Sequence, residues 1–232
     1  MTLDAIAQHR RQVLARIQAA TEHAGRPAAA VELIAVSKKQ PAAAIRAAHA
    51  AGQRDFGESY LQEALDKQAQ LTDLDDIAWH FIGRIQSNKT RQIAAHFDWV
   101  HSLADAAHAR RLSEQRPPGL PPLQVCIQVN LSSETSKGGV APDEVGALLE
   151  QCTGLAGLRV RGLMTLPAPS DDEAEQRHPF RALRELRDRL ATPECPLDVL
   201  SMGMSDDLEA AILEGATQVR IGTAVFGTRP AD

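Results

Sequence analysis

Short apolar segments of this chain alternate with longer segments in which apolar residues recur every three or four positions. The clearest short segment is 123–130, where Val125, Ile127 and Val129 occupy every second position. Alternation with a period of two is typical of a β-strand, and a spacing of three to four residues is typical of an amphipathic helix. The predicted strands are 33–37, 55–57, 79–83, 98–101, 123–130, 158–164, 199–201 and 218–221.

A helical pattern follows each of the first seven predicted strands. These helices cover 41–51, 60–71, a segment from 88, 104–114, 142–152, 171–191 and 206–214. Strands that alternate with helices form a parallel sheet, and eight of them close a (β/α)₈ TIM barrel. An open doubly wound sheet would usually have fewer strands and a glycine fingerprint after one of them, which this sequence lacks. The pattern therefore predicts an α/β barrel.

The length of the chain and the lack of a linker segment predict one domain. Its 232 residues suit a single barrel. Apolar residues at helical spacing within residues 1–25 predict an N-terminal helix that packs on the barrel. The proline-rich segment 116–122 precedes a strand directly, so we interpret it as a stiff loop at the N-terminal face of the barrel. We therefore expect residues 1–232 to form a single domain.

Composition narrows the class of protein. Hydrophobic residues make up 44% of the chain, and the formal net charge is −5. That charge gives no general attraction to nucleic acid or to an anionic membrane. The cysteines Cys126, Cys152 and Cys195 are scattered, which does not indicate a disulfide framework or a metal site. No apolar run is long enough to span a membrane, and charged residues interrupt the N-terminus where a signal peptide would be apolar. These features predict a cytoplasmic protein.

In a TIM barrel the active or binding site lies at the C-terminal ends of the strands. Small and polar residues gather at those positions here, whereas the bodies of the strands are aliphatic. We therefore expect the binding residues there, and no pair of histidines or carboxylates has the spacing of a metal site. The candidates are Lys38, Lys39, Ser59, His80, Asn130, Met164, Ser201, Gly203, Arg220, Gly222 and Thr223.

A lysine after the first strand is the leading nucleophile, because its amine can condense with an aldehyde. Lys38 and Lys39 compete for this role. Lys38 has the strand parity of Ile34 and Val36, and branched side chains favour the lumen of a barrel. Parity therefore favours Lys38, although both lysines can also be solvated residues at the end of a strand.

Two glycine loops predict a phosphate site. Barrels often bind phosphate with the loops after strands seven and eight, and Ser201, Gly203, Gly222 and Thr223 lie in those loops. Glycine lets backbone N–H groups approach phosphate oxygens, and hydroxyls can donate to the same oxygens. Ser205 precedes an acidic helix start, so we expect it to be an N-cap.

Arg220 and His80 each allow two interpretations. The Arg220 guanidinium cannot accept a proton, so it can face a ring nitrogen and keep it unprotonated. It can also form a structural ion pair with a carboxylate such as Glu58. His80 lies within the third predicted strand, where a hydrogen-bonded core histidine is more common than a base.

These residues together resemble the pyridoxal phosphate homeostasis protein family, whose members are single-domain relatives of the alanine racemase N-terminal barrel. The likeness extends over nearly the whole chain, with its segments in the same order. The matching segments are 35–38 (AVSK), 56–58 (FGE), 79–83 (WHFIG), 86–89 (QSNK), 161–164 (RGLM), 201–207 (SMGMSDD) and 219–227 (VRIGTAVFG).

The resemblance implies that pyridoxal 5′-phosphate (PLP) is held as a Schiff base on Lys38. It also implies that Ser201, Gly222 and Thr223 hold the phosphate and that Arg220 faces the pyridine nitrogen. Family members often have asparagine where this chain has Ser59, so the role of that side chain is open. Lys137 lies in a segment typical of the family and is either a second PLP acceptor or a solvated loop lysine.

PLP is an electron sink, but the protein decides what is done with it. Racemases related to this family use a tyrosine from a second domain, and this sequence ends at Asp232, just after the predicted barrel. We therefore expect a monomeric PLP carrier without robust turnover, which delivers the cofactor to apo-enzymes and binds neither nucleic acid nor membrane. The alternatives are a PLP-dependent amino-acid racemase and a lysine aldolase for a phosphorylated sugar.

Overall fold

Eight parallel strands form a closed barrel, which confirms the predicted (β/α)₈ fold. The computed structural model describes residues 3–131 and 138–228. Each strand pairs with the next one along the chain, and the last pairs with the first, with Glu32 beside Gln218 and Ala35 beside Ile221. The strands are β1 (Glu32–Val36), β2 (Asp55–Glu58), β3 (Ala78–Phe81), β4 (Trp99–Leu103), β5 (Leu123–Gln128), β6 (Leu158–Met164), β7 (Val199–Ser201) and β8 (Gln218–Ile221).

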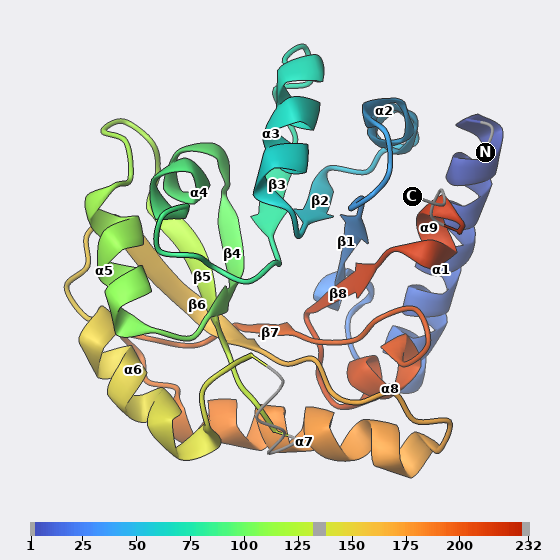
Figure 1. Ribbon diagram of the computed structural model, residues 1–232. Helices are drawn as coiled ribbons and strands as arrows, with labels where there is room; N and C mark the ends of the chain where they lie inside the picture. The colour runs from blue at the N-terminus through green and yellow to red at the C-terminus, as the bar shows by residue number, and fades with distance from the viewer. Residues whose placement is uncertain (1–2, 132–137, 229–232) are drawn as a thin grey trace.

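Helices surround the barrel (Figure 1). The N-terminal helix α1 packs against α2, α8 and α9. No helix in the described ranges is long and apolar enough to cross a membrane. The helices are α1 (Leu3–His23), α2 (Ala42–Ala50), α3 (Leu61–Gln70), α4 (Thr90–His96), α5 (Ala106–Glu114), α6 (Val145–Cys152), α7 (Glu173–Leu190), α8 (Leu208–Leu213) and α9 (Thr223–Phe226), with short 3₁₀ turns at Ala28–Ala30 and Pro142–Glu144.

The main hydrophobic core lies between the strands and the surrounding helices. Phe56, Ile93, Leu112 and Phe180 are fully buried members of it. A smaller apolar cluster of Cys126, Met164 and Val199 packs against Trp99. Burial of aliphatic and aromatic side chains on the outer surface of the barrel is the main force that holds the helices in place. The apolar side chains pack in this core, and polar residues lie at the C-terminal ends of the strands.

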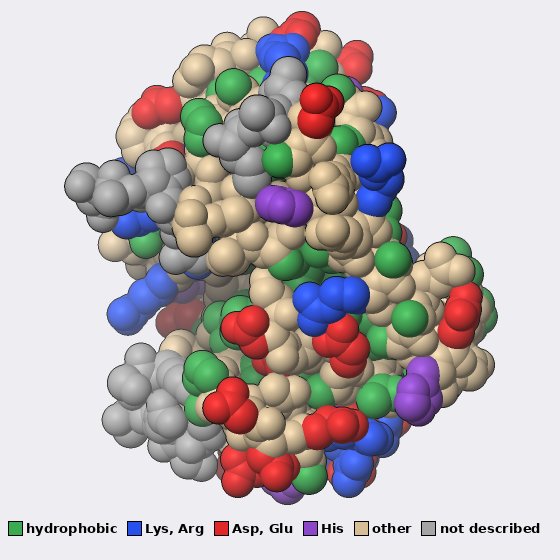
Figure 2. Space-filling model, turned by 90° about the vertical axis from the view of Figure 1, so that its right-hand side faces the viewer, with side chains coloured by type: hydrophobic (Ala, Val, Ile, Leu, Met, Phe, Trp, Pro, Cys, Tyr) green, Lys and Arg blue, Asp and Glu red, His purple; other side chains and the backbone are tan. Residues whose placement is uncertain are grey.

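Charged side chains of both signs are interspersed on the face shown in Figure 2. This view looks at the side of the molecule that is on the right in Figure 1. A mixture of signs agrees with the small net charge of −5. Such a surface has no extended field of one sign across this face.

Two boundaries differ from the sequence prediction in ways that affect the site. Strand β1 ends at Val36, so Lys38 lies in the turn that follows and not in the strand. Strand parity therefore does not fix the direction of its side chain. Helix α8 begins at Leu208, and Asp207 is the residue at its N-cap position. The N-cap predicted at Ser205 is therefore wrong.

Candidate functional site

A pocket of about 350 Å³ opens where the C-terminal ends of β1, β2, β7 and β8 meet. Its size lies within the range of roughly 300–1,000 Å³ that is typical of small-molecule sites. Val36, Ile82, Leu166 and Met204 give it apolar walls. Its polar side chains belong to Lys38, Ser59, Ser205, Asp206, Arg220 and Thr223, and Gly222 contributes backbone.

Lys38 and Lys39 differ in their place relative to the pocket. Lys38 is half-buried and lines the pocket, whereas Lys39 is exposed and does not line it. Lys39 has a φ of +60°, a left-handed conformation that is uncommon for a residue other than glycine. Its backbone N–H donates to Oε1 of Glu63 at 2.5 Å. This turn gives the two lysines different environments and favours Lys38 as the amine of the site.

A buried ion pair supports the turn of Lys38. The Lys67 ammonium donates to the Ser37 carbonyl oxygen and to Oε1 of Glu58, both at 2.7 Å. The Ser37 hydroxyl donates to the same carboxylate oxygen at 2.6 Å. Burial raises the pKa of Glu58, and the charge of Lys67 opposes that shift only in part. The backbone before Lys38 is therefore fixed by interactions that also link β2 to α3.

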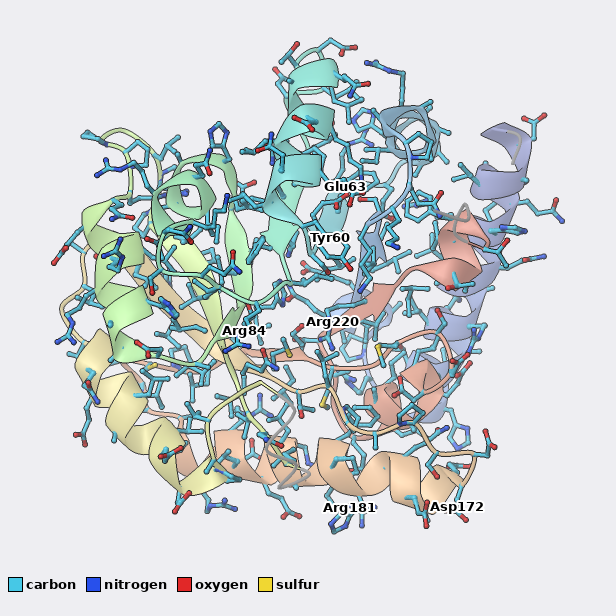
Figure 3. All side chains as sticks on the ribbon, in the orientation of Figure 1. Tyr60, Glu63, Arg84, Asp172, Arg181 and Arg220 are labelled. Carbon is cyan, nitrogen blue, oxygen red and sulfur yellow. The ribbon has the colours of Figure 1, made fainter. Side chains whose placement is uncertain are left out.

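The alternative ion pair between Arg220 and Glu58 is absent among the contacts of these described residues, since Glu58 bonds to Lys67 and Ser37. Arg220 is only 4% exposed and lies near the centre of the barrel, below Tyr60 in Figure 3. Its guanidinium donates to the Ser201 hydroxyl at 2.7 Å and to the Thr165 carbonyl oxygen at 3.0 Å. These bonds use two of the five N–H donors of arginine.

The charge of Arg220 persists at neutral pH. Burial lowers the pKa of Arg220 to about 10, and the negative charge of Asp207 opposes this shift. A group with this pKa is protonated in almost every molecule at pH 7. The pocket therefore contains a fixed cation that cannot accept a proton from a bound ligand.

Glycine at position 203 permits close packing between the loop after β7 and helix α8. Gly203 has a φ of +99°, and a Cβ atom there would lie 2.7 Å from the Cβ of Ala211. Its carbonyl oxygen accepts from the Arg220 backbone N–H at 2.9 Å. Gly203 itself does not line the pocket, whereas Ser205, Gly222 and Thr223 do.

A second close approach, between the backbone of Gly83 and that of Ser59, holds Ser59 in place. A Cβ atom at Gly83 would lie 2.0 Å from the backbone oxygen of Ser59. Only a glycine at position 83 therefore lets the loop after β3 lie against Ser59. The hydroxyl-bearing residue is thus fixed at the rim of the pocket.

The remaining predicted residues lie outside this pocket. Ser201 and His80 are fully buried inside the barrel, and Met164 packs in the apolar cluster with Val199. Asn130 lines a neighbouring pocket, and Leu166 lines both pockets. Lys137 lies outside the described residues. The interpretation of His80 as a hydrogen-bonded core residue fits its contacts with Asp55 and His101.

Sequence reasoning missed Ser205, Asp206, Met204 and Leu166 as pocket residues. The first three belong to the loop after β7 that was predicted to bind phosphate, so the sequence indicated the loop but not these residues of it. Leu166 follows β6 directly. Its position just past a strand end was the only available indication.

The sequence and its barrel match a known class of protein. The profile described as alanine racemase, N-terminal domain matches residues 9–230, and the chain belongs to this family. Within it, a Pseudomonas aeruginosa protein named pyridoxal phosphate homeostasis protein is 60% identical over 227 residues, which cover 98% of this chain and 97% of that protein. The protein of the same name from Escherichia coli K12 is 47% identical over 226 residues, with 97% of each covered. The chain is therefore a member of the pyridoxal phosphate homeostasis proteins.

Solved structures agree with this assignment. PipY of Synechococcus elongatus, solved with PLP bound, superposes with a TM-score of 0.82 at 41% identity and covers 96% of this chain and all of that chain. Alanine racemase from Corynebacterium glutamicum gives a TM-score of 0.66 at 23% identity, and this chain spans 61% of its length. The second similarity shows a shared barrel fold.

Proposed function

We propose that this chain binds PLP in the pocket between β1 and β8 and serves in PLP homeostasis. The observation that carries the proposal is the presence of the Lys38 amine, the Arg220 guanidinium and the Gly222–Thr223 backbone in one pocket. Amine, guanidinium and hydroxyl groups are the donors that a phosphorylated pyridine aldehyde requires. The name of the close relatives and the PLP bound to PipY support the same ligand.

Lys38 is the residue that we propose to hold the cofactor covalently. Its Nζ would form a C=N bond with the aldehyde carbon of PLP, with loss of one water molecule, to give a Schiff base. Bound PLP supplies an electron sink for amines attached to it. Lys38 is half-buried and lines the pocket, so an aldehyde bound there can reach its amine.

The phosphate would lie between the loop after β7 and the start of α9. Thr223 is the first residue of α9, and the first N–H groups of a helix have no acceptor within that helix. The backbone of Gly222 and Thr223 and the hydroxyl of Ser205 can therefore donate to the phosphate. Ser201 was expected to do so, but its hydroxyl already contacts Arg220 and His101. We therefore propose that Ser201 acts through Arg220.

Arg220 favours a carrier over a catalyst. A cationic side chain opposite the pyridine nitrogen keeps that nitrogen unprotonated and weakens the electron sink of PLP. Among the described residues, the titratable side chains that line the pocket are Lys38, Asp206 and Arg220. We propose that this set holds the cofactor without robust turnover and releases it to apo-enzymes. The free cysteines suit a reducing cytoplasm, where we expect the chain to act as a monomer.

The proposal is tested by reduction of the purified, PLP-loaded protein with borohydride, followed by peptide mass spectrometry. Before reduction the wild-type protein should be yellow. After reduction it should carry a pyridoxyl group on Lys38. Lys38→Gln should lose both the colour and the adduct, while the neighbouring Lys39→Gln should retain them. An adduct on Lys39 alone, or a colourless protein after incubation with PLP, would contradict the proposal.

A second experiment separates the carrier from a racemase. Loaded wild-type protein is incubated with single L-amino acids, and the D-enantiomer is measured by chiral chromatography. We expect no more than trace conversion. Sustained turnover that is lost in Lys38→Gln would instead establish an amino-acid racemase.

A further inference from the structure

A row of hydrogen bonds crosses the interior of the barrel and ends on the arginine of the pocket. Arg220 Nη1 lies 2.7 Å from Ser201 Oγ, which lies 2.8 Å from His101 Nδ1. His101 Nε2 lies 2.9 Å from His80 Nδ1, and His80 Nε2 lies 3.2 Å from Asp55 Oδ1. These five residues come from β8, β7, β4, β3 and β2. The row therefore joins five of the eight strands.

The middle residues of this row are excluded from solvent, whereas Asp55 at its end is partly exposed. Ser201, His101 and His80 are fully buried, whereas the Asp55 side chain is 34% exposed. Asp55 is the first residue of β2, so the row runs from the N-terminal end of the barrel towards the pocket at its C-terminal ends. A buried polar group that loses its partner is costly, so each link constrains the next.

Chemistry gives the row one direction. A guanidinium can only donate, so Ser201 accepts from Arg220. Its own hydroxyl proton can then be donated to Nδ1 of His101. His101 must carry its proton on Nε2 and donate it to Nδ1 of His80, and His80 then donates from Nε2 to the Asp55 carboxylate. With a singly protonated His80 ring, the opposite arrangement would point a bare ring nitrogen at the Asp55 carboxylate, which cannot donate when ionised.

The surroundings of His101 favour its neutral form. Burial, followed by the proximity of His80 and of Arg220, lowers the pKa of His101 well below its usual range. The His80 ring stacks on Trp99, with ring centroids 5.6 Å apart and planes at 5° to each other. The Arg161 guanidinium lies 5.4 Å from the centre of the Trp99 ring. The ring planes are therefore held by packing as well as by hydrogen bonds.

We propose that Asp55, His80, His101 and Ser201 are positioning residues that orient the Arg220 guanidinium towards the cofactor pocket. Histidines that only filled the lumen would need no common direction of donation and no carboxylate at the end. This inference rests on the proposed function, because it assigns Arg220 to the pyridine nitrogen of PLP. The row consists only of protein side chains and can be measured in protein from which PLP has been removed.

The direction is tested by ¹⁵N NMR of the histidine rings in protein from which PLP has been removed. At pH 7.5 both rings should carry a proton on Nε2 and none on Nδ1. A proton on Nδ1 of either ring would overturn the proposed direction. This measurement does not depend on PLP, so it separates failure of the row from failure of PLP binding.

The positioning role is tested with His80→Phe, which keeps an aromatic ring beside Trp99 and removes the hydrogen bonds. We expect the Arg220 Nη–H signals to exchange faster with solvent and the Kd for PLP to rise about tenfold. The absorbance maximum of bound PLP should also shift. Asp55→Asn keeps the shape at the end of the row and should give a smaller change in the same direction.

Val199→Ala is the matched control, because it opens a cavity among apolar neighbours in the barrel interior without removing a link. It should lower thermal stability but leave the Arg220 exchange rate and the absorbance maximum unchanged. If Val199→Ala moves both readouts as much as His80→Phe, the row serves only stability and the positioning role is wrong. Unchanged readouts in His80→Phe would also overturn the positioning role.

Discussion

Lys67 on α3 and Glu58 at the end of β2 form an ion pair whose nitrogen and oxygen atoms are 2.7 Å apart, with side chains 6% and 0% exposed. The Lys67 ammonium also binds the carbonyl oxygen of Ser37, one residue before Lys38. The pair therefore joins the stability of the barrel to the geometry of the turn that carries the candidate nucleophile.

Lys67→Met should destabilise the protein strongly. It would leave the Glu58 carboxylate buried without its counter-ion, and loss of one partner of a buried pair typically costs about 3–5 kcal/mol. Urea unfolding at pH 7 measures this change. Arg46→Met is the control, because it removes an exposed pair with Asp73 and should change the free energy of unfolding much less. Equal losses in both variants would show that burial does not determine the strength of the Lys67 pair.

Gly83→Ala should lower the melting temperature and weaken PLP binding. The added Cβ would lie 2.0 Å from the Ser59 backbone oxygen, so the loop after β3 must move away from the pocket rim. Gly146→Ala on α6 is a matched substitution, since its nearest contact would be Leu190 Cδ2 at 3.7 Å. Alanine should stabilise that helix by about 1 kcal/mol. Calorimetry compares the two, and a Gly83→Ala protein as stable as wild type would contradict the close approach.

Stability should fall as the pH is lowered from 7.5 to 5.5, in part because of His101. Its pKa in the folded protein is well below the ordinary value of 6.5, so below pH 6.5 the unfolded chain takes up a proton that the folded protein does not bind. The contribution is fully present above pH 6.5 and is lost as the pH falls towards the folded pKa. Urea unfolding at both pH values measures it. His101→Gln should show a smaller loss, whereas the exposed His178→Gln should behave as wild type.

Thiol labelling should distinguish the three cysteines. Burial raises the pKa of Cys126 to about 12 and that of Cys152 to about 11, and the thiolate is the reactive form. Cys195 is only partly buried. Iodoacetamide at pH 8, followed by peptide mass spectrometry, should label Cys195 first, and the other two only after urea is added. Early labelling of Cys126 would show that the barrel interior opens in the native state.

The fold could be read from the sequence because strand and helix periodicity is a local property. Alternation in segments such as 123–130 located β5, and the count of eight strands indicated closure. The glycine loops after β7 and β8 could be found in the same way, because a loop that follows a strand must lie at the C-terminal end of the barrel.

The contacts of the individual site residues could not be predicted from the sequence. Strand parity favoured Lys38 over Lys39, and the family resemblance implied the same residue. However, β1 ends at Val36, and the lysine that lines the pocket lies in the turn that follows. Ser201 and Ser205 both belong to the predicted phosphate loop, and only their positions in space show that Ser205 lines the pocket while Ser201 lies beneath Arg220.

The sequence by itself determined the order of elements, the barrel and the two loops that form the pocket, because these follow from spacing between near neighbours in the chain. The tertiary structure decided which side chains meet inside the barrel. His101 and Ser201 are 100 residues apart in sequence and bonded at 2.8 Å. Contacts of that kind depend on how the strands are staggered around the closed sheet, and no local pattern records that stagger.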